Sequence, residues 1–182
     1  MRIITGKYGG RRIHPPAKMP YTRPTTDVAK EGLFNILENN IAITGLKTLD
    51  IFGGTGSITY ELASRGAVDL TIVEKDPKMY AFIQKSISDL NIENVKTVKM
   101  DVFRFLESCF EKYDLIFAGP PYALKEIDEL PRIINEQKKL LNKNGWFILE
   151  HTPANNYEKE PMFRSMRNYG TTVFSIFINN NI

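Results

Sequence analysis

From residue 46 to residue 150 the chain alternates short apolar runs with longer amphipathic segments, and this alternation constrains the fold more than any other feature. The segments between the runs repeat apolar residues at the 3.6-residue period of a helix. Strands separated by helices form right-handed βαβ units, so such strands lie parallel in a sheet that helices cover on both faces. The sequence therefore predicts an α/β fold built on one mostly parallel sheet.

Five parallel strands and two antiparallel strands are expected in this sheet. The parallel strands comprise residues 46–52, 69–74, 95–100, 113–118 and 145–150. After His151 the pattern changes, and residues 163–169 and 171–177 predict an antiparallel hairpin. The expected fold is thus a seven-stranded, mostly parallel sheet that ends in an antiparallel C-terminal hairpin.

Helices are expected between these strands. Residues 57–65 and 126–141 read as helical, and Asp76 caps a helix that begins at Pro77. A short helix after the third strand carries an apolar face of Phe103, Leu106 and Phe110. Before the sheet, Thr25 or Thr26 caps a helix whose apolar residues are Val28, Phe34, Leu37 and Ile41.

The first 30 residues carry most of the positive charge. They hold seven basic side chains and one acid, a local charge of +6, whereas the whole chain carries +3. Residues 1–13 predict a β-hairpin with Gly9 and Gly10 in its turn, and residues 14–23 form a proline-rich connector. A basic arm on a mildly acidic body favours a polyanionic partner, although a solvated surface hairpin would also explain the charge. We therefore expect an extension over residues 1–23 and one domain over residues 24–182.

Composition excludes several classes of protein. Cys109 is alone, which excludes an internal disulfide and agrees with a reducing cytoplasm. With only His14 and His151 beside it, a metal site is not expected. No apolar run approaches the roughly 18 residues of a membrane helix, and the N-terminus lacks the apolar centre of a secretion signal. We expect a cytoplasmic protein that acts as a monomer.

A glycine-rich turn follows the first predicted strand. Gly53, Gly54 and Gly56 let the backbone approach a ligand closely at the carboxyl ends of the strands. Glu74 ends the second strand 18 residues after Gly56, where an acid can bind both ribose hydroxyls of an adenosine. The pattern predicts a nucleotide-type cofactor.

Asp50 distinguishes between two such cofactors. It lies just before the glycine turn, where its carboxylate would repel the pyrophosphate of a dinucleotide but attract an ammonium group. S-adenosylmethionine (SAM) carries an ammonium group and no phosphate, so we favour SAM over NAD. Asp50 could instead accept hydrogen bonds from backbone amides at the strand end. Asp101 and Val102 close the third strand and could contact adenine, or Asp101 could cap the next helix.

Two adjacent prolines and an aromatic residue follow the fourth predicted strand in the stretch FAGPPY. Pro120 and Pro121 cannot continue a sheet ladder, so they form a rigid elbow and leave backbone carbonyls without a ladder partner. Beside a cofactor, such an elbow can hold a flat ring where a methyl acceptor must enter. Tyr122 supplies an aromatic face there, and ordinary core packing is the alternative for its ring.

Five stretches resemble a known family, in order along nearly the whole chain. They are MRIITGKYGGRRI, RPTTDVAKEGLFNIL, LDIFGGTGSITYELASRGA with VEKD, DVFRFL, and YDLIFAGPPYAL with ILEH. The chain resembles the RsmD-type 16S ribosomal RNA (guanine-N2)-methyltransferases, within the SAM-dependent amino-methyltransferases that carry an Asn/Asp-Pro-Pro-aromatic motif. The resemblance implies a Rossmann-like methyltransferase fold, SAM as the cofactor, and ribosomal RNA within a small-subunit particle as the partner.

The resemblance also implies roles for particular residues. The elbow residues expected to hold the target base are Gly119, Pro120, Pro121 and Tyr122. The residues expected to bind the cofactor are Asp50, Phe52, Gly53, Gly54, Gly56, Glu74, Lys75, Asp101 and Val102. The residues expected to bind RNA are Arg2, Lys7, Arg11, Arg12, Arg23 and Lys30. In such enzymes the aromatic residue stacks on a flipped base, while acceptors in the elbow orient its exocyclic amine.

Gly119 departs from the family pattern, which has Asp or Asn at this position. Glycine removes one side-chain acceptor, a loss that can cost about a hundred- to a thousandfold in rate. Asp114 lies roughly 16 Å back along the strand, so no nearby carboxylate is expected to replace it. Three functions stay open: an impaired guanine-N2 methyltransferase, an adenine-N6 methyltransferase of DNA or RNA, and an RNA-binding or assembly factor that keeps the SAM pocket.

Overall fold

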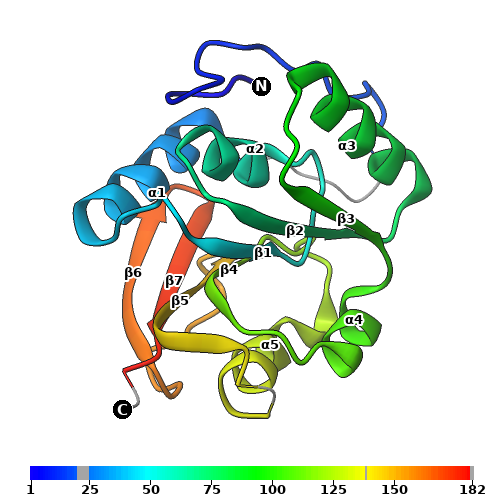
Figure 1. The fold of residues 1–182 in the computed structure, drawn as a ribbon. Coiled ribbons are helices and arrows are strands. Elements are labelled where there is room, and N and C mark those ends of the chain that lie inside the picture. Colours follow the sequence, from blue (N-terminus) through cyan, green and yellow to red (C-terminus); the bar gives the residue numbers. More distant parts are fainter. Residues whose placement is uncertain (20–24, 138, 181–182) are drawn as a thin grey trace.

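A twisted sheet forms the centre of the molecule (Figure 1). The computed structural model describes residues 1–19, 25–137 and 139–180. Within these residues seven strands form one sheet in the order β3-β2-β1-β4-β5-β7-β6. The strands are β1 (Lys47–Asp50), β2 (Asp69–Glu74), β3 (Val95–Lys99), β4 (Tyr113–Ala118), β5 (Leu141–His151), β6 (Phe163–Tyr169) and β7 (Thr172–Ile178).

The directions of the strands confirm the predicted sheet. Strands β1 to β5 run parallel, and β7 lies antiparallel between β5 and β6. β1 pairs with β2 on one side and with β4 on the other, so the direction of winding reverses between β1 and β4. In open α/β sheets, ligands bind at such a reversal, just beyond the carboxyl ends of the strands.

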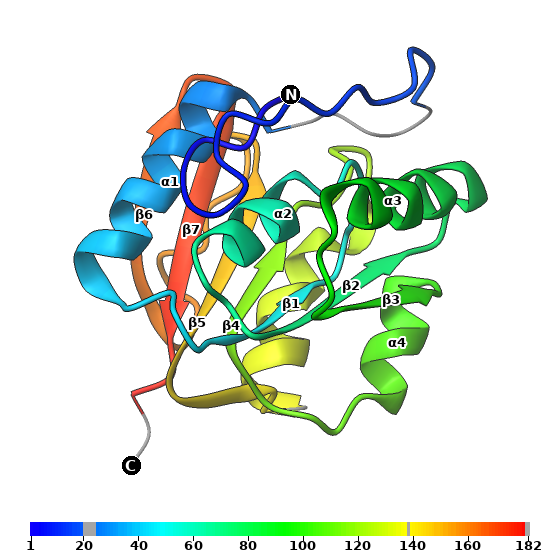
Figure 2. The ribbon, with the colours of Figure 1, turned by 45° about the horizontal axis from the view of Figure 1, so that its top comes forward.

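Helices cover both faces of the sheet, as Figures 1 and 2 show. One face carries α1 (Asp27–Asn40), α2 (Ser57–Ser64) and α3 (Pro77–Leu90). The other carries α4 (Val102–Ser108) and α5 (Leu130–Arg132), with a 3-10 helix over Lys125–Glu129 and a π-helix over Ile133–Gln137 on either side of α5. Each face buries its own apolar cluster, which explains why the central strands read as continuous apolar runs.

Local capping explains where α1 and α3 begin. The Thr26 hydroxyl oxygen accepts a hydrogen bond from the Ala29 N–H at 3.2 Å. The Asp76 carboxylate accepts from two backbone N–H groups of the first turn of α3, each at 2.9 Å, and Pro77 occupies the first helical position. Thr26 is therefore the cap of α1, and the Thr25 hydroxyl makes a different contact.

Four details differ from the sequence prediction. Val28 and Phe110 are 72% and 85% exposed, so neither belongs to the buried face of a helix. Val28 lies in the first turn of α1, and Phe110 follows the end of α4. The helical run that was predicted to reach Leu141 ends at Gln137. Leu141 already belongs to β5, because it pairs with Tyr113 of β4.

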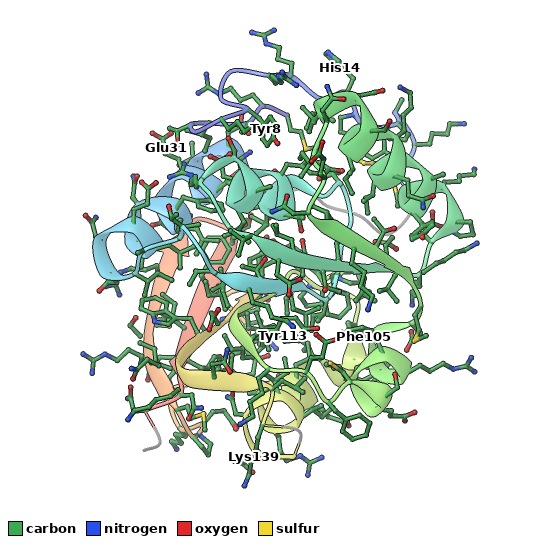
Figure 3. All side chains as sticks on the ribbon, in the orientation of Figure 1. Tyr8, His14, Glu31, Phe105, Tyr113 and Lys139 are labelled. Carbon is green, nitrogen blue, oxygen red and sulfur yellow. The ribbon has the colours of Figure 1, made fainter. Side chains whose placement is uncertain are left out.

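The N-terminal segment, residues 1–19, folds back on itself without forming a regular hairpin. One isolated antiparallel bridge joins Arg2 and Arg12, in place of the predicted two-stranded ladder. Ile3, Tyr8 and Ile13 are buried in the same apolar cluster as α1, α2 and α3, so the segment packs on helices (Figures 2 and 3). The predicted domain boundary at residue 23 lies outside the described residues.

Glu61 of α2 fixes the N-terminal segment to the rest of the fold. Its carboxylate is fully buried and accepts hydrogen bonds from the N–H groups of Ile4 at 2.8 Å and Thr5 at 3.2 Å. The same carboxylate lies 2.8 Å from the Arg65 guanidinium and 3.8 Å from the Lys30 ammonium group. A buried carboxylate is tolerated only where hydrogen bonds and opposite charges compensate it, and three parts of the fold supply them here.

Candidate active site

The turn between β1 and α2 is closed by its own hydrogen bonds. The Gly53 N–H donates to the Val73 carbonyl, and the Gly56 N–H donates to the Gly53 carbonyl, each at 2.7 Å. Gly54 and Gly56 have positive φ angles of 51° and 76°. A Cβ on Gly53 would lie 2.9 Å from the Ile72 side chain, so a larger residue would have to displace its neighbours. The turn thereby brings backbone to the edge of the sheet where the strand order reverses.

Replacing Gly56 by Ala is expected to destabilise the protein by about 2 to 4 kcal/mol, because two costs add. The left-handed φ of 76° disfavours any side chain, and a Cβ would lie 2.3 Å from the buried Tyr60 ring. Urea unfolding measures the loss. Gly10→Ala is the matched control, since Gly10 has φ 81° but no atom lies within 4 Å of the point that its Cβ would occupy. Equal losses in both variants would contradict the clash with Tyr60.

Asp50 ends β1 and is buried beneath this turn. Its carboxylate accepts hydrogen bonds from the Thr59 hydroxyl at 3.1 Å and from the Phe52 N–H at 3.3 Å. The bond from Phe52 matches the alternative view of Asp50 as a strand-end acceptor, and Thr59 was not predicted. Burial raises the pKa of Asp50 to about 8, and the charges of Glu74 and Glu150 act in the same direction. A cation placed beside Asp50 would compensate this buried charge.

Glu74 ends β2 beside the glycine turn. One of its carboxylate oxygens accepts from the Gly54 N–H at 2.7 Å, and the other accepts from the Asp76 N–H at 2.8 Å. These bonds fix the carboxylate between the turn and the start of α3. Each oxygen keeps a second lone pair, so the group can still accept from hydroxyls such as those of a ribose.

Asp101 and Val102 follow β3 at the same edge. One Asp101 oxygen accepts from the Phe103 N–H at 3.0 Å and caps α4, as one of the two predicted roles requires. The other oxygen lies 3.8 Å from the ammonium group of Lys75, an exposed ion pair that contributes little to stability. Val102 is buried in the apolar cluster under α4. Contact of this pair with adenine stays a prediction.

The side chains at this edge fit SAM better than a dinucleotide. The structure brings together the predicted cofactor residues Asp50, Phe52, Gly53, Gly54, Gly56, Glu74, Lys75, Asp101 and Val102. Asp50, Glu74 and Glu150 lie close enough for the charges of the other two to raise the pKa of Asp50. SAM is positively charged at its ammonium and sulfonium groups, whereas a pyrophosphate would add negative charge to an acidic site.

The proline elbow follows β4 at the same edge. Pro120 is buried and Pro121 is half-buried, whereas Tyr122 is 37% exposed. The Tyr122 hydroxyl lies 3.5 Å from the Thr171 carbonyl and 3.4 Å from the Thr172 hydroxyl, so the ring is tied to the start of β7. Its exposure disfavours the core-packing alternative and leaves the ring accessible to a flat partner.

A carboxylate that the sequence did not predict lies beside Gly119. Ala118 pairs with Leu149 in the sheet, so the next residues, Gly119 and Glu150, are neighbours at its carboxyl edge. A Cβ on Gly119 would lie 3.4 Å from Glu150 Oε2 and 3.0 Å from the Phe117 ring. The expectation that no carboxylate lies near Gly119 is therefore wrong. The stretch ILEH carried the signal, since it places an acid where the strand next to β4 ends.

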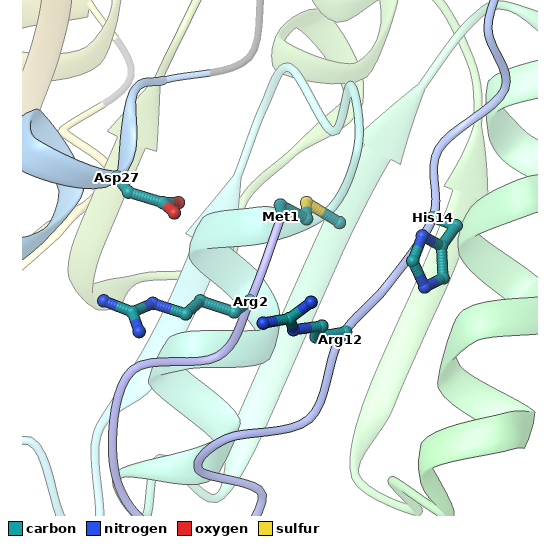
Figure 4. Close-up of a pocket in the computed structure, with 5 residues that line it drawn as sticks. All are labelled: Met1, Arg2, Arg12, His14 and Asp27. Atoms are coloured by element: carbon teal, nitrogen blue, oxygen red, sulfur yellow. The ribbon is translucent and has the colours of Figure 1, made fainter.

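Two of the predicted RNA-binding arginines line a surface hollow beside α1 (Figure 4). The hollow has a volume of about 370 Å³ and is lined by Met1, Arg2, Arg12, His14 and Asp27. Arg2 and Arg12 are both exposed. The isolated bridge between these residues sets their backbones side by side, and both side chains line the hollow.

The other predicted RNA-binding residues divide into three cases. The exposed Lys7 and Arg11 side chains lie 5.3 and 5.6 Å from the centre of the Tyr8 ring. Lys30 is buried, and its ammonium group donates to the Arg2 carbonyl at 2.5 Å. Burial lowers the pKa of Lys30, although Glu61 acts to raise it, and no RNA phosphate can reach this side chain. The prediction for Lys30 is therefore wrong, and Arg23 lies outside the described residues.

His151 has a structural role. It is fully buried, and its ring nitrogens lie 2.8 Å from the Thr152 carbonyl and 2.8 Å from the Ser175 hydroxyl. Burial lowers the pKa of its ring. The described residues contain no group of three or more His, Cys, Asp and Glu side chains that could hold a metal ion. They also contain no helix with the length and apolar character needed to cross a membrane.

Known proteins resemble the chain over most of its length. The family described as Conserved hypothetical protein 95 matches residues 1–178. The ribosomal RNA small subunit methyltransferase D of Buchnera aphidicola subsp. Acyrthosiphon pisum is 34% identical over 149 residues, which cover 81% of this chain and 76% of the relative. The protein of the same name from Escherichia coli K12 is 32% identical over 150 residues, with coverages of 82% and 71%.

The fold of the chain is also found among solved structures. A solved structure of a hypothetical protein from Thermus thermophilus has a TM-score of 0.85 and 25% identity, and covers 97% of this chain and 98% of that one. The family match spans the glycine turn, the proline elbow and the N-terminal segment alike. The chain therefore belongs to the Conserved hypothetical protein 95 family, which is the RsmD-type methyltransferase family that its sequence resembles.

Proposed function

We propose that this chain is a SAM-dependent methyltransferase that methylates the exocyclic N2 of a guanine in small-subunit (16S) ribosomal RNA. The observation that carries the proposal is the buried carboxylate of Asp50 at the same sheet edge as the proline elbow. The names of the two relatives support ribosomal RNA as the substrate. The proposed enzyme acts as a monomer in the cytoplasm, where a lone cysteine stays reduced.

The carboxyl edge of the sheet would hold SAM through side chains from three strands. Asp50 would bind the ammonium group, Glu74 the ribose hydroxyls, and Asp101 with Val102 the adenine. When bound, SAM supplies a methyl group on a positively charged sulfur, which keeps the electrons of the broken C–S bond and becomes a neutral thioether. The residues of this chain fix that group in place, so that the acceptor need only be oriented.

The elbow would orient the target base. Tyr122 would stack on the flipped ring, and the Pro120 carbonyl would accept a hydrogen from the exocyclic amine. An acceptor in this position turns the nitrogen lone pair towards the methyl donor and stabilises the positive charge that develops on the nitrogen. No covalent bond between RNA and protein is needed, because the methyl group passes directly to nitrogen and the nitrogen then loses one proton to water.

The N-terminal segment would bind RNA phosphates through Arg2, Lys7, Arg11 and Arg12, all of which are exposed. With about four phosphate contacts, the association constant for ribosomal RNA is expected to fall about 50- to 150-fold between 50 and 200 mM salt. Fluorescence anisotropy with labelled ribosomal RNA measures this fall. An affinity that does not change with salt would contradict the role of the segment.

A double variant, Arg2→Ala with Arg12→Ala, tests the same interface. It is expected to reduce the steepness of log K against log salt by about 1.4 to 1.8, because two phosphate contacts are lost. Lys159→Ala removes an exposed lysine far along the chain and is the matched control. If Lys159→Ala reduces the slope as much as the double variant does, the salt effect reflects the overall charge of the protein and not these two arginines.

The function itself is tested by a methyl-transfer assay on small ribosomal subunits from cells that lack the protein. With isotopically labelled SAM, mass spectrometry of the digested RNA is expected to find the label in N2-methylguanosine. Adenine N6 methylation is the second candidate, because a carbonyl acceptor and an accessible Tyr122 ring suit any exocyclic amine. Label in N6-methyladenosine would support this candidate. RNA binding without any methyl transfer would support an assembly factor instead.

A further inference from the structure

The edge where β4 and β5 end holds a carboxylate next to the one position that departs from the family motif. In the parallel register Ala118 faces Leu149, which sets Gly119 beside Glu150. Glu150 Oε2 lies 3.4 Å from the point that a Cβ on Gly119 would occupy. The acceptor oxygen of an Asp or Asn at residue 119 would lie two bonds beyond that point. The Glu150 oxygen therefore lies close to the space that the missing acceptor would fill.

Glu150 is held in this place by a residue that lies just before α1. The Thr25 hydroxyl donates to Glu150 Oε2 at 2.6 Å, across 125 residues of sequence. Glu150 is only 5% exposed, so its carboxylate is largely shielded from bulk water. Its charge also acts on Asp50, which places it on the side of the sheet edge where the cofactor is expected. An acceptor held this way is preorganised.

A side chain at residue 119 would meet two neighbours. A Cβ there would lie 3.0 Å from the Phe117 ring, closer than ordinary van der Waals contact. An Asp at this position would in addition set a second negative charge beside Glu150, and like charges that share a site repel each other. Asp114, the acid nearest in sequence before Gly119, is already engaged, since it accepts from the Lys47 N–H at 2.9 Å and from Asn142 at 2.8 Å.

We propose that Glu150 replaces the absent side chain of residue 119 as the acceptor for the exocyclic amine of the target base. This inference rests on the proposed methyltransferase function. One Glu150 oxygen accepts an amine hydrogen while the Pro120 carbonyl accepts the other, which turns the nitrogen lone pair towards the methyl carbon. As the N–C bond forms and the C–S bond breaks, the positive charge on nitrogen is stabilised by the carboxylate, and the extra proton leaves to water. The chain is then an active enzyme in spite of Gly119.

Two substitutions at residue 150 test the proposal in the small-subunit methylation assay. Glu150→Ala removes the acceptor and is expected to lower kcat about 100- to 1,000-fold. Glu150→Gln keeps a neutral acceptor and a partner for Thr25, so its kcat is expected to fall only about tenfold, since charge-assisted hydrogen bonds are stronger than neutral ones. The control Glu158→Ala, which removes an exposed acid, is expected to leave kcat unchanged.

Binding of S-adenosylhomocysteine (SAH), measured by calorimetry, separates this role from a structural one. Both variants are expected to bind SAH within about threefold of the wild-type affinity, because Glu150 is assigned to the amine and Asp50 to the ammonium group. A purely structural Glu150 would weaken SAH binding and lower kcat together. Glu150→Gln keeps the shape of the side chain. If this variant loses SAH affinity and kcat together, the proposal is overturned.

A second-site substitution gives the sharpest readout. Gly119→Asn in the Glu150→Ala background supplies a neutral acceptor from the other strand and is expected to raise kcat at least tenfold over Glu150→Ala alone. Glu150→Ala removes the carboxylate oxygen 3.4 Å from the new Cβ, whereas the Phe117 ring at 3.0 Å has to shift slightly to admit it. A kcat that stays at the level of Glu150→Ala would overturn the assignment of Glu150 as the replacement acceptor, as would a Glu150→Ala variant with wild-type kcat.

The assay also distinguishes failure of the inference from failure of the proposed function. Label in N6-methyladenosine, with the expected loss in Glu150→Ala, would reject the guanine substrate and keep the role of Glu150. Label in N2-methylguanosine with no effect of Glu150→Ala would reject the role of Glu150 and keep the substrate. A wild-type protein that transfers no methyl group to ribosomal RNA would reject both.

Discussion

Replacing Asp50 by Asn is expected to weaken SAH binding by about 30- to 1,000-fold, because it removes one charge of a buried, hydrogen-bonded pair. Asp50 is 2% exposed and is proposed to bind the ammonium group that SAH shares with SAM. Asn has nearly the same shape: its amide oxygen can accept from the Phe52 N–H, and its NH2 group can donate to the Thr59 hydroxyl oxygen, so the fold is expected to persist. Calorimetric titration at pH 8 measures the loss.

The same substitution is expected to make unfolding less sensitive to pH. Burial raises the pKa of Asp50 from 3.8 to about 8, so between these values the folded state holds a proton that the unfolded state has lost. The stability that this proton contributes is fully present below pH 3.8 and is lost as the pH rises through about 8. An Asn side chain has no such proton. Asp50→Asn should therefore favour the folded state relative to wild type more strongly at pH 8.5 than at pH 5.

Urea unfolding at these two pH values checks the sign, and SAH titration checks the linkage. The wild type is expected to bind SAH more tightly at pH 8 than at pH 6, since the cation binds the ionised carboxylate and displaces its proton. Asp89→Asn, at an exposed acid of α3, is the matched control for both measurements. Wild-type SAH affinity in Asp50→Asn would show that no ammonium group binds at this carboxylate.

Replacing Glu61 by Ala is expected to destabilise the protein by about 3 to 5 kcal/mol, because it leaves buried charges without their partner. Lys30 and Arg65 both lie against this carboxylate, and Lys30 is 1% exposed. The N–H groups of Ile4 and Thr5 lose their acceptor as well. The free energy of unfolding in urea measures the total effect.

Glu38 provides the matched control for Glu61. It also pairs with Arg65, at 2.6 Å, but its side chain is 49% exposed. Glu38→Ala is therefore expected to cost less than about 1 kcal/mol. Glu61→Ala is further expected to speed tryptic cleavage between Lys7 and Arg12, because the N-terminal segment is released from α2. A Glu61→Ala variant as stable and as protease-resistant as Glu38→Ala would contradict the anchoring role of Glu61.

The sequence predicted the sheet because its central strands β1, β2, β4 and β5 are mostly buried and lie next to local stop signals. The cap formed by Asp76 with Pro77 involves residues adjacent in sequence, and the structure contains it as predicted. The position of Val28 was predicted wrongly because it lies on the outer side of the first turn of α1, whereas the next two residues of that turn, Ala29 and Lys30, are buried. The hydrophobic pattern of a single segment shows which of its residues are apolar, but not which of them contact the rest of the fold.

In the candidate site, too, features set by neighbouring residues could be predicted, whereas contacts between residues distant in sequence could not. The positions of Asp50 and Glu74 could be predicted because each is the last residue of a strand, and parallel strands bring their ends to one edge. The roles of Lys30 and Glu150 depend on partners far away in sequence, such as Thr25 for Glu150 at a separation of 125 residues. A lysine in a basic stretch is usually solvated, and nothing local showed that Lys30 would meet a buried acid.

The packing of the N-terminal segment has a thermodynamic consequence for its encounter with a polyanion. Ile3, Tyr8 and Ile13 are already buried, so the conformational entropy of this segment was lost when the chain folded. A disordered basic tail would order itself on the RNA and show a large negative change in heat capacity. In this protein the arginines lie on a segment that is already folded before RNA binds. The heat-capacity change on association is therefore expected to be small, as for two proteins that bind without refolding.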